Sequence, residues 1–134
     1  MTVAKRELLP LQTSSDVVVA RQKVRQWAIE LRFSLIDQTK LVTAASELAR
    51  NALDHGQGGQ MTIEVVNGAA RSGLRLTFED HGPGIPDIEM ALKDGYTTGA
   101  GMGLGLGGSK RLVNDFFIES ETGKGTKITV VRWK

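Results

Sequence analysis

The sequence predicts an α+β fold, a two-layer sandwich in which helices cover one face of a mixed, mainly antiparallel sheet. Three observations support this prediction. Two segments of the first half carry apolar residues at helical spacing, several short segments are apolar and β-branched, and turn-forming residues join some of those short segments directly. The length of 134 residues suits one domain and is too short for two ordinary ones. We therefore expect residues 1–134 to form a single domain.

The first part of the chain is expected to hold one strand followed by two helices. Glu7–Leu11 is typical of a short opening strand. Ser14-Ser15-Asp16 is a helix N-cap signal, and the apolar residues after it recur at helical spacing, which predicts an amphipathic helix over Asp16–Arg32. A second helix is expected to begin at Asp37 and to end at Gly56, because glycine commonly follows the last turn of a helix.

The middle of the chain is expected to form a hairpin and a loop. Met61–Val66 and Leu74–Phe78 should pair as antiparallel strands, since the polar segment Asn67–Gly73 turns the chain between them. We expect Glu79–Pro86 to be a loop, followed by a weak helical turn over Asp87–Lys93.

Glycine dominates the segment that follows. Seven of the 16 glycines lie between Gly95 and Gly108, and such a segment is either a spacer or a loop whose backbone must approach a ligand closely. The segment leads directly into a helix expected over Gly105–Asp115, which argues against a spacer. Two strands, Phe116–Glu121 and Thr126–Trp133, should complete the sheet.

Composition excludes several classes of protein. The absence of cysteine excludes disulfides, thiolate metal sites and a cysteine nucleophile. The net charge is only +2, no run of basic residues is present and aromatic residues make up 5%, so we expect no nucleic-acid binding. No apolar segment approaches the roughly 18 residues that a membrane span needs, and Met1–Leu11 does not resemble a signal peptide. We therefore expect a cytoplasmic protein without membrane attachment.

A polar strip follows one edge of the second helix. With Glu47 as the origin, Asn51, Asp54 and His55 fall within about 80° on a helical wheel, beside the apolar face that should contact the sheet. Glutamate can accept a proton from a hydroxyl, and the asparagine oxygen suits a hard cation such as Mg²⁺. The same strip also fits a solvated helix edge, with His55 near the negative end of the helix dipole.

The loop after the second central strand begins with a carboxylate and contains two glycines. Asp80 could lie at the floor of a pocket and accept a hydrogen bond from an amino group such as that of adenine, while Gly82 and Gly84 would let a flat ring approach the backbone. An aspartate that caps a turn is the alternative interpretation.

The glycine-rich segment resembles two phosphate-binding motifs without matching either. Gly103-x-Gly105-x-x-Gly108 has the spacing of the dinucleotide fingerprint but does not follow a strand, and fewer than 30 residues remain after it. Gly108-Ser109-Lys110 has the wrong order for a P-loop. Backbone amides without obstructing side chains still suit a phosphate.

Taken together, these motifs resemble the nucleotide-binding boxes of the GHKL ATPase/kinase superfamily, which has the Bergerat fold. The motifs are Glu47-Leu48-Ala49-Arg50-Asn51 with His55-Gly56, Asp80-x-Gly82-x-Gly84, Gly101-x-Gly103-Leu104-Gly105-Leu106 and Gly125-Thr126. The resemblance extends from about Leu11 to Trp133. Within the superfamily the chain is similar to serine kinases of the anti-sigma-factor type, and most similar to the switch kinases of stressosomes.

The resemblance implies a role for each matching residue. Glu47 matches the catalytic base, Asn51 the Mg²⁺ ligand and Asp80 the aspartate that recognises adenine, supported by Thr126. The residues implied in binding ATP are Asn51, Asp54, His55, Asp80, Gly82, Gly84, Gly99, Gly101, Met102, Gly103, Leu104, Gly105 and Thr126. Residues from about 87 to 100 match the ATP lid, but Thr98-Gly99-Ala100 stands where some relatives carry an arginine near the γ-phosphate.

The implied function is that of an ATP·Mg²⁺-dependent serine/threonine protein kinase in a partner-switching pathway. Its substrate would be a STAS-domain antagonist, and a phosphatase or a sigma factor would be a further partner. Two alternatives remain open. One is a module that binds ATP and regulates its partners by docking alone, which the missing lid arginine favours, and the other is an anti-sigma factor that sequesters a sigma subunit.

Overall fold

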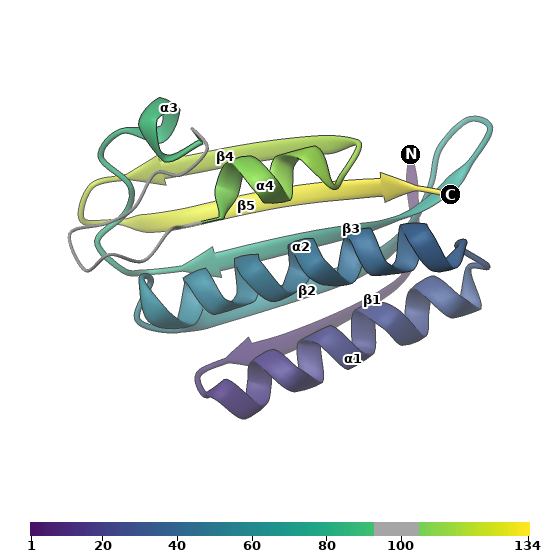
Figure 1. Cartoon of the computed structure of the whole chain (residues 1–134), viewed down its shortest axis with the longest axis horizontal. Helices are drawn as coiled ribbons and strands as arrows, with labels where there is room; N and C mark the ends of the chain where they lie inside the picture. The colour runs from purple at the N-terminus through teal and green to yellow at the C-terminus, as the bar shows by residue number, and fades with distance from the viewer. Residues whose placement is uncertain (93–104) are drawn as a thin grey trace.

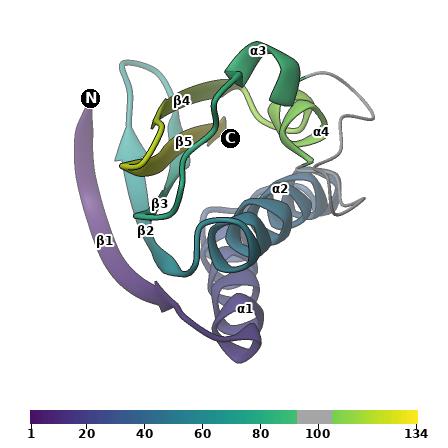
Figure 2. The ribbon, with the colours of Figure 1, turned by 90° about the vertical axis from the view of Figure 1, so that its left-hand side faces the viewer.

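The computed structural model describes residues 1–92 and 105–134 and confirms a two-layer α+β sandwich (Figure 1). Viewed along the sheet, the helices lie on one face of five strands (Figure 2). The elements are β1 (Thr2–Leu11), α1 (Ser14–Glu30), α2 (Leu35–Asp54), β2 (Gly59–Asn67), β3 (Ser72–Asp80), α3 (Ile88–Ala91), α4 (Leu106–Arg111), β4 (Asp115–Glu121) and β5 (Gly125–Trp133).

The sheet has the order β1-β2-β3-β5-β4, and all four pairings are antiparallel. The expectation of a mixed sheet was therefore wrong in this detail for the part of the chain that is described, because each strand runs opposite to its spatial neighbour. β3 is the central strand, and its last residue, Asp80, pairs with Gly59 of β2 on one side and Thr126 of β5 on the other. The end of β3 is therefore held by two neighbouring strands.

The core lies between the sheet and the long helices α1 and α2. The face of α2 that the helical spacing placed toward the sheet is buried, as Leu41, Ala45, Leu48 and Ala52 are each at most 3% exposed. Trp27 of α1 is also buried. Alanines predominate on this face of α2, so the helix axis can approach the sheet closely, and the helix spans its middle (Figure 1).

Helix boundaries differ from the sequence prediction where side chains cap them. Thr13, not the Ser14-Ser15-Asp16 segment alone, begins α1: its side chain accepts the Asp16 amide while the Asp16 carboxylate accepts the Thr13 amide. This reciprocal pair is a capping box, which satisfies two backbone donors at once. Ser34 similarly accepts the Asp37 amide, so α2 begins two residues before the predicted start at Asp37.

The predicted helix over Gly105–Asp115 was too long. α4 ends at Arg111, because the Asn114 amide donates to Val131 O and Asp115 already belongs to β4. The chain therefore pairs with β5 from this point instead of continuing the helix. Glu79 and Asp80, expected in a loop, instead extend β3, whose pairing with β5 continues to Thr126.

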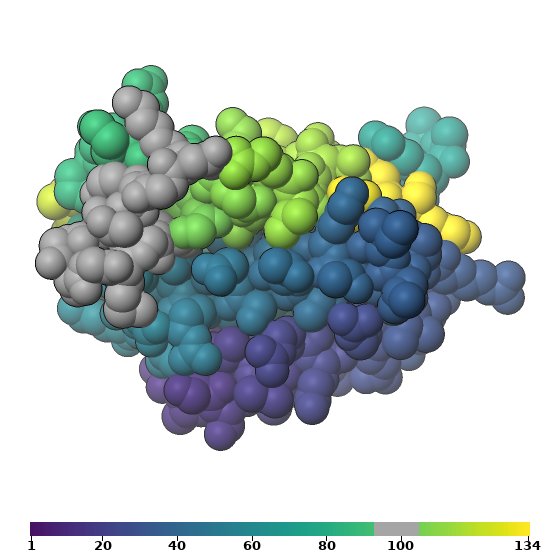
Figure 3. Space-filling view, in the orientation of Figure 1, coloured from purple at the N-terminus to yellow at the C-terminus, as the bar shows by residue number. Residues whose placement is uncertain are grey.

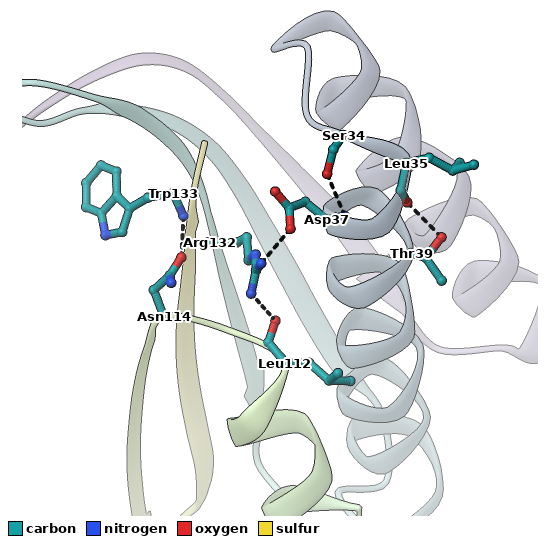
Figure 4. Close-up of polar contacts among 8 residues, drawn as sticks. All are labelled: Ser34, Leu35, Asp37, Thr39, Leu112, Asn114, Arg132 and Trp133. Carbon is teal, nitrogen blue, oxygen red and sulfur yellow. Dashed lines mark hydrogen bonds and ion pairs between the residues drawn. The ribbon is translucent and has the colours of Figure 1, made fainter.

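One arginine near the end of β5 joins three elements (Figure 4). Arg132 Nη2 lies 2.6 Å from Asp37 Oδ1 in the first turn of α2, and Arg132 Nη1 donates to Leu112 O, 3.1 Å away, at the end of α4. Trp133 N donates to Asn114 Oδ1 at 2.7 Å. These bonds fix the C-terminal end of α4 between α2 and β5. The hydrogen bond from Arg132 lowers the pKa of Asp37, although burial opposes the shift.

We predict that Asp37→Asn destabilises the protein by about 1 kcal/mol at neutral pH, since a partly exposed charge-assisted bond is screened by solvent. A carboxyl group whose pKa is lowered by folding stabilises the fold above its ordinary pKa of 3.8. This contribution is lost as the pH falls from that value through the lower folded pKa. Urea unfolding across the acid range should therefore show the difference between wild type and variant shrinking below pH 3.8. A difference that stayed constant would mean that the charge of Asp37 is unimportant.

Among the helices that the structure describes, none combines the length and apolar character needed to cross a membrane.

A candidate nucleotide cavity between α2 and the ends of β3 and β5

A cavity opens where the C-terminal part of α2 lies over the end of β3 and the start of β5. Its walls are mostly apolar, with a few polar groups that converge on the space, which is the usual character of a small-molecule site. The lining residues are Leu48, Asn51, Ala52, His55, Gly56, Phe78, Asp80, Gly84, Ile85, Leu106, Thr126 and Ile128. Five sequence-predicted site residues therefore meet here, from three separate motifs: Asn51, His55, Asp80, Gly84 and Thr126.

Asp80 provides the carboxylate of this cavity. Its Oδ1 accepts the Gly82 amide at 3.0 Å, and the backbone amide of Thr126 also donates to its side chain. Burial nevertheless raises the pKa of Asp80, and these two hydrogen bonds only oppose the shift. A half-buried carboxylate with remaining acceptor capacity favours a ligand that donates a hydrogen bond, because desolvation without a donor is costly.

Two glycines bring the end of α2 against the loop that follows β3. A Cβ on Gly56 would overlap the Asp80 carboxyl group, and a Cβ on Gly82 would lie 2.7 Å from Gly56 Cα. Gly82 does not line the cavity, so its space is taken by protein backbone rather than left for a flat ring. Gly84, with φ +78°, does line the cavity, although a Cβ there would overlap Glu121 O.

A hydroxyl pair supports the cavity from β4 and β5. Ser120 Oγ lies 2.9 Å from Thr126 Oγ1 and accepts the Ile85 amide at 2.7 Å. It also donates to Gly125 O. Ser120 thereby fixes both Thr126 and the loop that carries Gly84. Ser120 was not among the predicted site residues. Strand alternation places it on the same face as Phe116 and Ile118 but does not reveal its contacts with Thr126 and Ile85.

Only part of the polar strip of α2 lines the cavity. Asn51 and His55 line the cavity, whereas Asp54 is exposed and lies outside the lining. Glu47 is one turn earlier, and its carboxylate lies against the start of α4: a Cβ on Gly105 would be 2.5 Å from Glu47 Oε2. Gly105 adopts φ +65°, a left-handed conformation that glycine tolerates best.

Five further predicted site residues lie outside the described part of the chain. They are Gly99, Gly101, Met102, Gly103 and Leu104, and most of the predicted lid is outside it too. Asp87–Leu92, at the start of that lid, includes the short helix α3, whose N-cap Asp87 accepts the Met90 amide.

The donor set of the described residues suits a phosphate-bound Mg²⁺ rather than a metal held by protein alone. No group of three or more His, Asp or Glu residues there is arranged to hold a metal ion. Asn51 lines the cavity, and its side-chain amide has one neutral oxygen. Mg²⁺ commonly takes one or two protein oxygens and completes its coordination with phosphates and water, so this arrangement fits it.

The lining of the cavity therefore suits a flat, apolar ring that carries an amino group. Leu48, Phe78 and Ile128 offer apolar contacts, and Asp80 can accept a hydrogen bond from such a group. Asn51 and Glu47 lie along α2, so a polar tail attached to the ring would pass Asn51 before it met the carboxylate of Glu47.

The sequence is similar to those of several known proteins. Residues 36–134 match the family model described as histidine kinase-, DNA gyrase B-, and HSP90-like ATPase. The chain is 45% identical to Serine/threonine-protein kinase RsbT of Bacillus subtilis, with 92% of each chain covered. It is 36% identical to Anti-sigma F factor of Clostridium acetobutylicum, with 92% of this chain and 90% of that protein covered.

Solved structures of low sequence identity share the fold. The RsbU and RsbW domains of Rv1364c from Mycobacterium tuberculosis superpose with a TM-score of 0.66 at 20% identity, covering 98% of this chain and 33% of that one. The catalytic domain of histidine kinase ThkA gives a TM-score of 0.53 at 15% identity, covering 98% of this chain and 95% of that one.

Proposed function

Because the chain belongs to the histidine kinase-, DNA gyrase B- and HSP90-like ATPase family, we propose that it is an ATP-dependent serine/threonine protein kinase of a partner-switching pathway. One observation carries the proposal most directly: Asp80 and Asn51, distant in sequence, line the same cavity, and Glu47 lies one helical turn from Asn51. The similarity to a serine/threonine-protein kinase and to anti-sigma F factors supports the class of reaction and the type of pathway.

The cavity residues bind and orient the nucleotide. Asp80 accepts a hydrogen bond from the adenine amino group, and Thr126, fixed by Ser120, supports that contact. Asn51 would contribute an oxygen ligand to Mg²⁺, which would supply positive charge beside the phosphates during transfer of the terminal group.

Glu47 acts on the protein substrate. It takes the proton of a serine or threonine hydroxyl as the hydroxyl oxygen bonds to the terminal phosphorus and the bond from that phosphorus to ADP breaks. Its side chain is exposed at the edge of the cavity, where an incoming hydroxyl can meet it. A general base positioned in this way contributes roughly 10²–10⁴-fold to the rate.

The protein substrate we propose is a STAS-domain antagonist in the cytoplasm. Phosphorylation adds a charge of about −2 to the acceptor, so repulsion and desolvation should dissociate the complex. The freed kinase can then bind a second partner, for which a phosphatase or a sigma factor is the proposed identity.

Regulation by docking without phosphoryl transfer is the second candidate function. Thr98-Gly99-Ala100 supplies no arginine before the glycine-rich segment, and phosphoryl transfer depends on positioned positive charge. This alternative retains ATP binding and predicts that no phosphorylated partner forms.

We predict that ATP with Mg²⁺ stabilises the protein by about 2.7 kcal/mol at 100 times its dissociation constant, because the ligand binds only the folded state. Thermal unfolding with ATP, with and without Mg²⁺, measures this effect. Purified STAS-domain proteins from the same organism, incubated with the kinase and ATP labelled at the γ-phosphate, test the transfer. Stabilisation without transfer to any of them would favour the docking alternative, and no stabilisation by any purine nucleotide would exclude both.

A further inference from the structure

Three polar side chains form a row across β3, β5 and β4 beside the nucleotide cavity. Asp80 pairs directly with Thr126 of β5, and Thr126 pairs directly with Ser120 of β4. Residues directly opposite each other on antiparallel strands point to the same face of the sheet. This is the face that α2 and α4 cover, and the surfaces of these helices meet in the space-filling view (Figure 3). Asp80 and Thr126 line the cavity, whereas Ser120 lies on the far side of Thr126 and outside the lining.

The hydroxyl group of Ser120 uses its whole hydrogen-bonding capacity. A hydroxyl has one proton to donate and two lone pairs that accept. Ser120 Oγ donates to Gly125 O at 3.1 Å and accepts the Ile85 amide at 2.7 Å. Its third neighbour is Thr126 Oγ1, 2.9 Å away. Because the one serine proton is directed to Gly125 O, all three contacts are satisfied together only if Thr126 donates to Ser120.

This arrangement fixes the polarity of the Thr126 hydroxyl. Thr126 is only 9% exposed, and its proton is held by Ser120 Oγ, so the remaining capacity of the hydroxyl is that of an acceptor. Asp80 beside it is an ionised carboxylate, which also only accepts, and it already receives the backbone amides of Gly82 and Thr126. The row therefore presents two neighbouring acceptors to a ligand in the cavity.

We propose that Ser120 is a positioning residue that determines base specificity: by holding the proton of Thr126, it makes the cavity select a 6-amino purine over a 6-oxo purine. This inference rests on the proposed nucleotide-binding function and adds a residue that does not itself line the cavity. A 6-amino group offers two N–H donors, one for each acceptor, directly or through a bridging water. A 6-oxo group brings lone pairs against the same two acceptors and leaves them unpaired, which is costly.

Ser120→Ala tests the proposal by releasing the Thr126 hydroxyl, which can then turn and donate to a 6-oxo group. Isothermal titration with ATP and with inosine triphosphate, whose base carries a 6-oxo group and no other substituent, gives two dissociation constants. The wild type should prefer ATP, and this preference should fall about 3- to 10-fold in the variant, as expected for one neutral hydrogen bond. Loss of the bond to the Ile85 amide should weaken both nucleotides alike and so cancel in their ratio.

Thr126→Val provides a second variant, in case Ser120→Ala does not fold. Valine keeps the shape of threonine and leaves the bonds from Ser120 to Gly125 and Ile85 in place, so the preference for ATP should again fall. In the Thr126→Val background, Ser120→Ala should not lower the preference further, whereas a merely structural role would give it the same effect in both backgrounds.

The matched control is Ser72→Ala, the same substitution at the other end of β3. Ser72 Oγ also makes a hydrogen bond, to Asn67 Oδ1 at 2.7 Å, but Ser72 lies outside the cavity lining. This variant should keep the wild-type preference for ATP.

Several outcomes would overturn the assignment and leave the kinase proposal intact. They are an unchanged preference for ATP in folded Ser120→Ala or in Thr126→Val, a further fall when the two substitutions are combined, and a wild type that binds both nucleotides equally well. A wild type that binds neither nucleotide would instead overturn the proposed function on which the inference rests.

Discussion

Glu47→Gln should reduce phosphoryl transfer to the protein substrate by roughly 10²–10⁴-fold, the usual contribution of a general base. Glutamine keeps the shape of the side chain but cannot take up the proton of the acceptor hydroxyl. The carboxylate lies beside Gly105 at the edge of the cavity and not within its lining. We therefore expect the loss to fall on kcat, while the affinity for ATP changes little. Single-turnover transfer of labelled phosphate, together with ATP titration, measures both quantities.

The matched control is Glu30→Gln at the end of α1, which is the same substitution at another exposed carboxylate. Glu30 lies outside the cavity lining and forms an exposed ion pair with Lys5. Transfer should survive in that variant. If Glu47→Gln transferred phosphate as fast as the wild type, another group would have to accept the proton, and Glu47 would lose its assigned role.

Asp80→Asn should weaken ATP binding by about 10- to 100-fold, as expected for the loss of a hydrogen bond to a charged acceptor. The amide can still accept a bond through its oxygen, but its NH₂ group cannot share the space with the adenine amino group. Gly82 and Thr126 now donate to the carboxylate, so they would also lose a charged partner. Isothermal titration with ATP and GTP measures the effect. The wild type should prefer ATP, because guanine presents an oxygen where adenine presents an amino group.

Acidification provides an internal control for Asp80. Burial raises its pKa, so protonation of Asp80 should begin to weaken ATP binding at a higher pH than protonation of an exposed aspartate would. ATP binding by the Asp80→Asn variant should lack this pH dependence. Equal ATP affinities of wild type and Asp80→Asn at neutral pH would show that the cavity does not recognise adenine through this residue.

Much of the fold could be predicted because the local signals agree with the tertiary structure. Apolar residues of α2 repeat at helical spacing, so the buried face containing Leu41 and Leu48 was correctly identified, although Leu35 and Ile36 in the first turn are exposed. Boundaries were less predictable. They depend on competition between partners, such as the capping of α1 by Thr13 and the bond from the Asn114 amide to Val131 that ends the helical region after α4.

The site was predictable to the extent that its residues belong to recognisable motifs. Asn51, Asp80 and Thr126 line one cavity, although they come from three segments. The reason for two glycines was not predictable, because Gly56 makes room for the Asp80 side chain and Gly82 for the backbone of Gly56, and no local pattern reveals such contacts between segments. Ser120 was missed for a related reason: its importance comes from Thr126 and Ile85, which reach it only in the folded sheet.

The start of α4 has a kinetic consequence, because Leu106 lines the cavity whereas Gly105, just before the helix, lines a separate depression beside Glu47. A nucleotide in the cavity and a protein substrate that approached Glu47 from the other side would be bound together, and neither would have to leave before the other entered. Catalysis would then proceed through a ternary complex in which spent nucleotide and modified protein leave independently. The enzyme could stay loaded with fresh nucleotide while it exchanges one protein partner for the next.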